Sequence, residues 1–382
     1  MLPNLPRPVL LALAGALVIA VGIAAAVIFQ PPAAPAPAPS QTASPSPTPT
    51  ARPTRAPSPT PSPTPTPSPT PVAEAFCPIT GLPLASELPA DRRALTVQID
   101  NDPHARPQTG LSWADLIVEA TVQGNVTRFG AVFYCNDPDP AVGPIRSARY
   151  YNLDLWQQIG SLTVGFGGAP YTLQHFINGG MPYLNGIDGW WYFSRSFERI
   201  ASYNVYADPT AIRQDLAAGA LEPFKVGIDD VRPPFEVARD AAVPDGRPVG
   251  RLDIQTNGYW NYSFTYHADL GAYSRADAGQ VMIDAATADL VTVRTVVVQR
   301  VPQDEIFGVD FGVGGNPILH YLTGEGTGTV YVDGKALNVE WSRPDIGSTT
   351  TWTYAGTDEH VVLPPGQIWW QILPHSAAIT EG

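Results

Sequence analysis

The chain has 382 residues, with 22 Lys and Arg against 35 Asp and Glu, so its formal net charge at pH 7 is −13. Nucleic acids and anionic lipid surfaces attract basic proteins, and this charge therefore argues against both as partners. Proline is frequent, with 42 residues, and much of it falls in one tract near the N-terminus.

An apolar run occupies residues 9–29 and follows a short N-terminus at 1–8. At about 1.5 Å per helical residue, the run is long enough to cross a hydrocarbon core about 30 Å thick. It predicts a transmembrane anchor with residues 1–8 in the cytoplasm. A cleavable signal peptide is the alternative, because the alanines at 24–26 offer the small residues of a cleavage site.

A tract rich in Pro, Ser and Thr fills residues 30–75. Such composition predicts a disordered stalk, since little of it can be buried, and as polyproline II it would reach on the order of 100 Å. Stalks of this kind are typical of exported proteins. We therefore expect a single-pass protein of the cell membrane with an extracytoplasmic body. Its expected partners are the membrane, through the N-terminal helix, and cell-wall glycan or envelope proteins.

The body divides by pattern into two domains. Residues 76–228 mix strand and helix periods and predict an α/β domain with a mixed sheet. Residues 229–250 are a proline-containing connector, and residues 251–382 predict a smaller all-β sandwich or barrel. The strands expected in chain order are 95–99, 117–122, 126–135, 162–168, 259–268, 293–301, 328–341, 348–356 and 366–373.

Turns and helix starts between these strands can also be predicted from the sequence. Gly124-Asn125 and Asp333-Gly334 have the spacing and composition of hairpin turns. A short helical turn is expected at 110–116 with Ser112 as its cap. A helix is expected over 143–160, with Pro144 in its first turn.

Two cysteines, Cys77 and Cys135, are present. In an exported chain they can pair as a disulfide, and two buried free thiols are the alternative. Neither has a second Cys or a His at the spacing of a zinc site, so no metal site is expected.

Arginines dominate the candidate ligand site. Arg146 and Arg149 are three residues apart, which places them on one face of the expected helix, and guanidinium groups at a helix start suit phosphate, sulfate or carboxylate. Strand ends and glycines are expected to join them in a polar cleft. The ligand-binding candidates are Arg146, Arg149, Arg128, Asn101, Gly167 and Gly168, and the candidates for a catalytic base are Asp100 and Glu119.

A structural interpretation competes with this site. The same arginines can be held in ion pairs by Asp100, Glu119 and Asp154. His104 is a weaker candidate base, with a loop hydrogen bond as its alternative. The aromatic run at 190–193 can stack on sugar rings, with core packing as the alternative.

Several motifs together resemble the YerB-like lipoprotein family, a bacterial family of unknown function. They are CPITGLPL at 77–84, QIDNDPHARPQTGL at 98–111, ADLIVEA at 114–120, TRFGAVF at 127–133 and GPIRSAR at 143–149. The resemblance extends to that family's smaller C-terminal domain and implies an envelope location and a two-domain body. The expected anchor at 9–29 stands where relatives commonly carry a lipid-modified cysteine, and ASYNVYAD at 201–208 lacks a histidine that relatives often have there.

These features predict a membrane-anchored envelope protein that binds an anionic cell-wall or surface polymer through an arginine-lined cleft. A phosphotransferase or hydrolase acting on such a polymer is one alternative, and a scaffold without catalysis is another. The absence of a recognisable nucleophile favours binding over catalysis, and no cofactor is expected.

Overall fold

A computed structural model describes residues 74–124, 126–225, 231–256, 260–307 and 316–382. The expected anchor at 9–29 and almost all of the expected stalk lie outside these residues. No helix among the described residues is long and apolar enough to cross a membrane. Residues 70–382 form one compact unit, and both expected domains belong to it.

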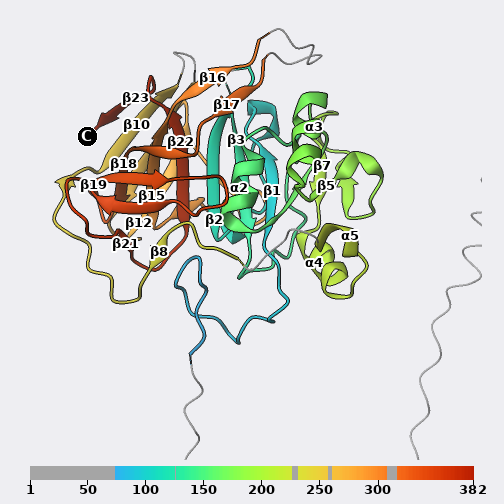
Figure 1. Cartoon of the computed structure of the whole chain (residues 1–382), viewed down its shortest axis with the longest axis horizontal. Helices are drawn as coiled ribbons and strands as arrows, with labels where there is room; N and C mark the ends of the chain where they lie inside the picture. The colour runs from blue at the N-terminus through green and yellow to red at the C-terminus, as the bar shows by residue number, and fades with distance from the viewer. Residues whose placement is uncertain (1–73, 125, 226–230, 257–259, 308–315) are drawn as a thin grey trace, which may run out of the picture. The chain divides into compact units, whose positions relative to one another are not determined.

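A mixed sheet of eleven strands runs through both expected domains (Figure 1). Its order is β20-β19-β18-β15-β22-β2-β3-β1-β4-β5, with β9 paired to β19. The strands are β1 (Leu95–Asp100), β2 (Leu116–Val122), β3 (Val126–Phe133), β4 (Leu162–Gly165), β5 (Tyr183–Asn185), β9 (Arg247–Pro248), β15 (Thr295–Val301), β18 (Gly324–Val332), β19 (Lys335–Arg343), β20 (Thr351–Tyr354) and β22 (Ile368–Pro374).

The junction of the two halves is the parallel pairing of β2 with β22, in register from Leu116 opposite Ile368 to Ala120 opposite Ile372. Strands from the N-terminal half continue the sheet on one side of this junction, and strands from the C-terminal half continue it on the other. Most of the central strands, including β1, β2 and β22, are buried along their whole length. Such burial on both faces requires a covering layer on each side.

A six-stranded antiparallel sheet covers one face. It contains β10 (Arg251–Thr256), β11 (Trp260–His267), β12 (Ala272–Asp277), β13 (Gln280–Val281), β14 (Thr292–Val293) and β23 (Ala378–Glu381). Phe264 of β11 meets Trp369 of β22 edge to face, with ring centroids 5.4 Å apart. This contact lies within one hydrophobic core shared by both halves.

Helix α2 (Asn152–Ile159) covers the other face, in front of β1, β2 and β3 in Figure 1. Tyr151, Leu155 and Ile159 pack there with residues of both halves, including Trp370. The remaining elements are η1 (Pro103–Ala105), η2 (Leu111–Trp113), α3 (Pro170–Gly179), η3 (Gly186–Asp188), α4 (Pro209–Ala217), α5 (Glu222–Lys225) and the paired short strands β6 (Phe193–Arg195) with β7 (Val205–Ala207), β8 (Glu236–Val237) with β21 (Val362–Leu363), and β16 (Gln303–Glu305) with β17 (Ile318–His320).

The expected fold class is confirmed: an N-terminal half with a mixed sheet and helices precedes a C-terminal half made of strands. The Asp333-Gly334 turn has positive φ at both residues, of 52° and 69°, as a two-residue hairpin with twisted strands requires. Gly124 has a φ of 80° in the connection between β2 and β3, while Asn125 lies outside the described residues.

Two local expectations are wrong. The helix expected over 143–160 begins only at Asn152, because residues 144–146 bond to β1 instead: the Asp100 amide donates to the Pro144 carbonyl and the Arg146 amide to the Gln98 carbonyl. Ser112 does not cap the turn near it, since η2 begins after Gly110 and has no side-chain cap.

A disulfide joins Cys77 to Cys135, with Cα atoms 5.7 Å apart. It ties the start of the body to the end of β3. Closing a loop with a sequence separation of 58 stabilises the folded state by about 4 kcal/mol on the chain-entropy account.

His320 offers a test of the packing between the halves. The ring lies in β17, 3% exposed, with Nε2 3.3 Å from the Thr121 hydroxyl of β2 and its plane edge-on to Tyr151. Burial lowers the pKa of His320 to about 4, from an ordinary value of 6.5.

The unfolded chain therefore takes up a proton between pH 6.5 and 4 that the native state does not, and stability falls as the pH falls through this window. We predict that His320→Gln removes about 3 kcal/mol of this acid destabilisation, measured as the difference between the two proteins in urea-unfolding curves at pH 7 and pH 4. If both proteins lost the same free energy of unfolding between pH 7 and pH 4, His320 would not be a buried, neutral ring.

Candidate functional site

The site begins at the carboxyl end of β1, where Asp100 lies directly opposite Arg128 of β3. Both side chains are buried, with exposed fractions of 2% and 4%, and an Arg128 nitrogen is 3.6 Å from Asp100 Oδ1. Burial lowers the pKa of Arg128, although Asp100 opposes the shift. The pair lies on the face of the sheet that α2 covers, since Gln98 on the same side of β1 accepts a hydrogen bond from Tyr151.

Arg146 provides the second guanidinium. The extended segment that runs beside β1 places its Nε 2.7 Å from Asp100 Oδ2, and a third of its side chain remains exposed. Arg146 therefore forms the solvent-accessible part of the cluster. Its position comes from pairing with β1 and does not need the helix face that the sequence suggested.

Arg149 is the third cation and lacks a carboxylate. Its Nη1 donates to the backbone carbonyls of Ser147 and Ala148, at 3.2 and 3.0 Å, and its Nε is buried without a partner among the described residues. The Ser147 carbonyl also accepts from Arg128, at 2.7 Å, so the two guanidinium groups lie side by side. Burial, followed by the charge of Arg128, lowers the pKa of Arg149 well below its usual value.

The charge of this arginine cluster, defined as Arg128, Arg146 and Arg149 around Asp100, is therefore unbalanced. Three guanidinium groups share one carboxylate, which leaves a formal charge of +2 on a largely buried group of side chains. Like charges brought together in a low dielectric are costly. An anion that bound here would relieve that cost.

The glycine loop after β4 supports the backbone of the cluster. The Gly167 carbonyl accepts from the Ala148 amide at 3.0 Å and from the Tyr183 hydroxyl at 2.6 Å, while the Gly167 amide donates to Asn185. Gly167 has a φ of +84°, and a Cβ at Gly168 would lie 2.7 Å from Leu173. These glycines thus border the cluster and serve packing, and the backbone groups of Gly167 are already hydrogen-bonded.

An aromatic and acidic rim surrounds the exposed side of Arg146. The ring of Tyr203 lies 5.1 Å from the Arg146 guanidinium carbon, and His104 stacks on the same tyrosine at 5.3 Å. His104 Nδ1 is 2.8 Å from Asp102. Burial raises the pKa of Asp102, but hydrogen bonds to His104 outweigh it and lower that pKa. His104 is therefore held in the rim as a hydrogen-bonded loop residue.

Glu119 does not join the cluster. It faces the six-stranded sheet, is fully buried, and receives Arg275 Nε and Nη2 at 3.1 and 2.7 Å and the Trp369 indole at 3.0 Å. Burial raises the pKa of Glu119, and Arg275 opposes the shift. Asn101 points to this second group as well, because its amide donates to Thr127, which donates in turn to Glu119.

The two candidate bases thus lie on opposite faces of one sheet. The structural interpretation is met in part, since Asp100 pairs with Arg128 and Arg146, whereas Asp154 pairs with Arg343 of β19 at 3.1 Å. No local pattern in the sequence points to Arg275 or Trp369, which lie in the other half of the chain.

Comparison with known proteins assigns the chain to a family. Residues 79–222 match the model described as the N-terminal domain of a protein of unknown function, DUF3048, and residues 251–370 match the C-terminal domain of the same family. The chain belongs to the DUF3048 family.

One relative, YerB of Bacillus subtilis, supports this assignment in both sequence and structure. YerB of strain 168, named as a candidate lipoprotein, is 27% identical over 315 residues, covering 80% of this chain and 88% of YerB. The crystal structure of YerB matches with a TM-score of 0.66 at 24% identity, covering 80% of this chain and 100% of that chain. The second match shows that the fold is shared.

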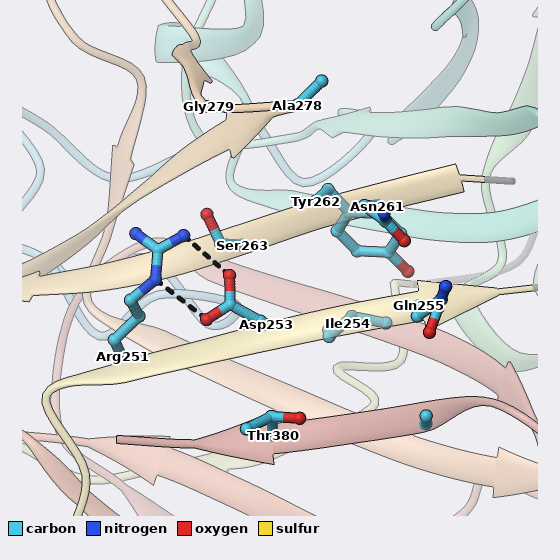
Figure 2. Close-up of a pocket in the computed structure, with 11 residues that line it drawn as sticks. Arg251, Asp253, Ile254, Gln255, Asn261, Tyr262, Ser263, Ala278, Gly279 and Thr380 are labelled. Atoms are coloured by element: carbon cyan, nitrogen blue, oxygen red, sulfur yellow. Dashed lines mark hydrogen bonds and ion pairs between the residues drawn. The ribbon is translucent and has the colours of Figure 1, made fainter. Parts of the chain in front are cut away.

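A surface groove in the C-terminal DUF3048 domain is the main rival of the cluster. It has a volume of about 260 Å³ and lies over β10, β11 and β23. Figure 2 shows Arg251 and Asp253 facing each other on β10, where Arg251 Nη2 and Nε donate to the Asp253 carboxylate at 2.6 and 2.9 Å. Because Asp253 neutralises Arg251, the groove offers no excess charge, and it contains none of the residues expected from sequence.

The aromatic run at 190–193 is divided between packing and surface. Tyr192 is buried and its hydroxyl donates to Asp215 at 2.6 Å, and Trp190 packs edge-on against Phe224. Trp191 is 66% exposed. Packing therefore accounts for Trp190, Tyr192 and Phe193, which also packs on the core, whereas Trp191 is the exposed ring of the run.

Among the described residues, one group of side chains has the atom types and spacing of metal ligands. Cys77, Asp115 and Cys135 bring ligand-type atoms within 4.8 Å of one another. The two sulfurs are bonded as a disulfide and cannot act as thiolate ligands. Asp115 accepts the amides of Tyr134 and Cys135 at 2.7 and 2.8 Å.

Because the charge of Arg149 has no carboxylate partner, we can predict how its removal changes the free energy of unfolding. Replacing a half-buried cation that has no carboxylate partner with an apolar side chain of similar length removes a desolvation cost. We expect Arg149→Met to raise the free energy of unfolding by about 1–2 kcal/mol, measured by urea denaturation in phosphate-free, low-salt buffer. A loss of stability of that size would show that Arg149 is already compensated. Arg343→Met, which breaks a buried pair with Asp154, is the control expected to destabilise.

Proposed function

We propose that the body binds an anionic group of a cell-wall or surface polymer at the arginine cluster. The observation that carries the proposal is the unpaired, half-buried Arg149 beside Arg128. Phosphate and carboxylate oxygens accept several N–H donors at once and suit guanidinium groups. Arg146, with a third of its side chain exposed, is the point of entry for such a ligand.

The envelope location is part of the proposal. The apolar run at 9–29 and the proline-rich tract after it suit an anchor and stalk. The relative YerB is named as a candidate lipoprotein, which agrees with attachment to a membrane. A body attached in this way would meet cell-wall and surface polymers, whose phosphate or carboxylate groups match the charge of the cluster.

Binding is better supported than catalysis. Asp100, the base candidate nearest the cluster, is held by Arg146 and Arg128 and accepts the Asp102 amide at 3.3 Å. A carboxylate whose lone pairs are engaged in this way is poorly placed to take a proton from a substrate. Glu119 lies on the other face of the sheet and is bonded to Arg275.

The test is a thermal-shift titration of residues 70–382 with poly(glycerol phosphate) and with a neutral glucan of similar length. We expect the phosphate polymer to raise the unfolding temperature, because a ligand at a hundred times its Kd contributes about 2.7 kcal/mol. Arg146→Gln with Arg149→Gln should abolish the shift. Arg251→Gln, on an exposed arginine paired with Asp253, is the matched control and should keep it.

A shift that survives the double substitution, or one produced equally by the neutral glucan, would contradict the proposed site. Raising the salt concentration should also weaken the shift if charge drives it.

A further inference from the structure

An exposed apolar loop lies next to the arginine cluster. It spans residues 196–204, between β6 and β7. Phe197 is fully exposed and Ile200 is 62% exposed. Large apolar side chains that are grouped in water at the tip of a loop are typical of a contact site.

The loop is held in place by hydrogen bonds. At its base the Ser196 amide donates to the Asn204 carbonyl at 2.8 Å, and Arg195 donates to the Asn204 side chain at 2.8 Å. Arg199 reaches across to the carbonyl of Pro107 at 2.6 Å. The exposure of Phe197 is therefore imposed by a braced loop.

The same loop forms one wall of the cluster. Tyr203, near its end, lies over the Arg146 guanidinium at 5.1 Å, and the Ile145 amide donates to Val205 at 2.7 Å. Phe197 and Ile200 thus stand on the segment that covers the exposed cation. Arg195 and Arg199 belong to the loop and its base, and neither has a carboxylate partner among the described residues.

We propose that this loop docks the body on an anionic lipid surface, with a headgroup phosphate at Arg146 and the side chains of Phe197 and Ile200 in the acyl boundary. The proposal rests on the proposed function, since the same cluster receives the anion. Phe197 lies between Arg195 and Arg199, and Ile200 follows Arg199 directly. Exposed aromatic and aliphatic side chains beside arginines are typical of interfacial membrane contact. A bilayer accepts a protruding tip, whereas a protein partner needs a matching hollow.

The overall charge of −13 does not oppose this docking. Charges farther than about 8–10 Å are screened at physiological salt, so the bilayer responds to the charges of the loop. There Arg195 and Arg199 outnumber the exposed Glu198. This revises the expectation from composition that anionic lipid is disfavoured. The apolar run at 9–29 would also hold the body near a bilayer at high effective concentration, so weak docking suffices.

The test is co-sedimentation of residues 70–382, which form one compact unit, with vesicles of phosphatidylglycerol and phosphatidylcholine. We expect the body to bind these mixed vesicles at least ten times more tightly than vesicles of pure phosphatidylcholine. Phe197→Ser with Ile200→Ser should weaken binding at least tenfold. Phe307→Ser with Leu270→Ser, at residues 72% and 57% exposed elsewhere, is the matched control and should bind as wild type.

The outcomes separate this inference from the proposed function. If the loop variant binds vesicles as wild type does, or wild type binds no vesicles while poly(glycerol phosphate) still shifts its unfolding temperature, docking is overturned and the anion site stands. If Arg146→Gln with Arg149→Gln changes neither vesicle binding nor the shift in unfolding temperature caused by the polymer, the proposed function fails as well. Loss of vesicle binding in the loop variant with the polymer shift retained supports both.

Discussion

The ion pair between Glu119 of β2 and Arg275 of β12 is the interaction on which the structure depends. Both side chains are buried, at 0% and 1% exposed, and the Trp369 indole of β22 donates to the same carboxylate. Burial would lower the pKa of Arg275, but Asp277 and Glu119 outweigh it and raise that pKa. Separating the two halves would take Arg275 away from Glu119 and leave it only Asp277 of its own strand as a partner. A buried charge that loses a partner costs several kcal/mol. The halves are therefore parts of one folded body.

The same pair is connected to the proposed anion site through consecutive residues of the chain. Asn101 contacts Thr127 on the Glu119 side of the sheet, while Asp100 holds Arg128 and Arg146 on the α2 side. Arg106 bridges Asn101 and Asp277. The arginine cluster thus takes its geometry from strands whose other face is covered by the C-terminal half.

Local pattern predicted most strands and the Asp333-Gly334 hairpin, because alternation and turn chemistry are encoded over a few residues. It failed for 143–151, where pairing with β1 overrides helical periodicity. It could not join β2 to β22 or Glu119 to Arg275, since these partners are 250 and 156 residues apart. Arg146 and Arg128 were predicted to meet Asp100 and do so, whereas the unpaired state of Arg149 follows only from the placement of every carboxylate around it.

Native-state hydrogen exchange of Arg275→Ala tests directly whether the body is one unit. The substitution lies in β12, far along the chain from β1 and β3. If the buried pair joins the halves, the free energy of amide exchange should fall by about 3–5 kcal/mol in β1 and β3 as well as in β11 and β12. A loss confined to β10, β11 and β12, with β1 and β3 as protected as in wild type, would contradict the account.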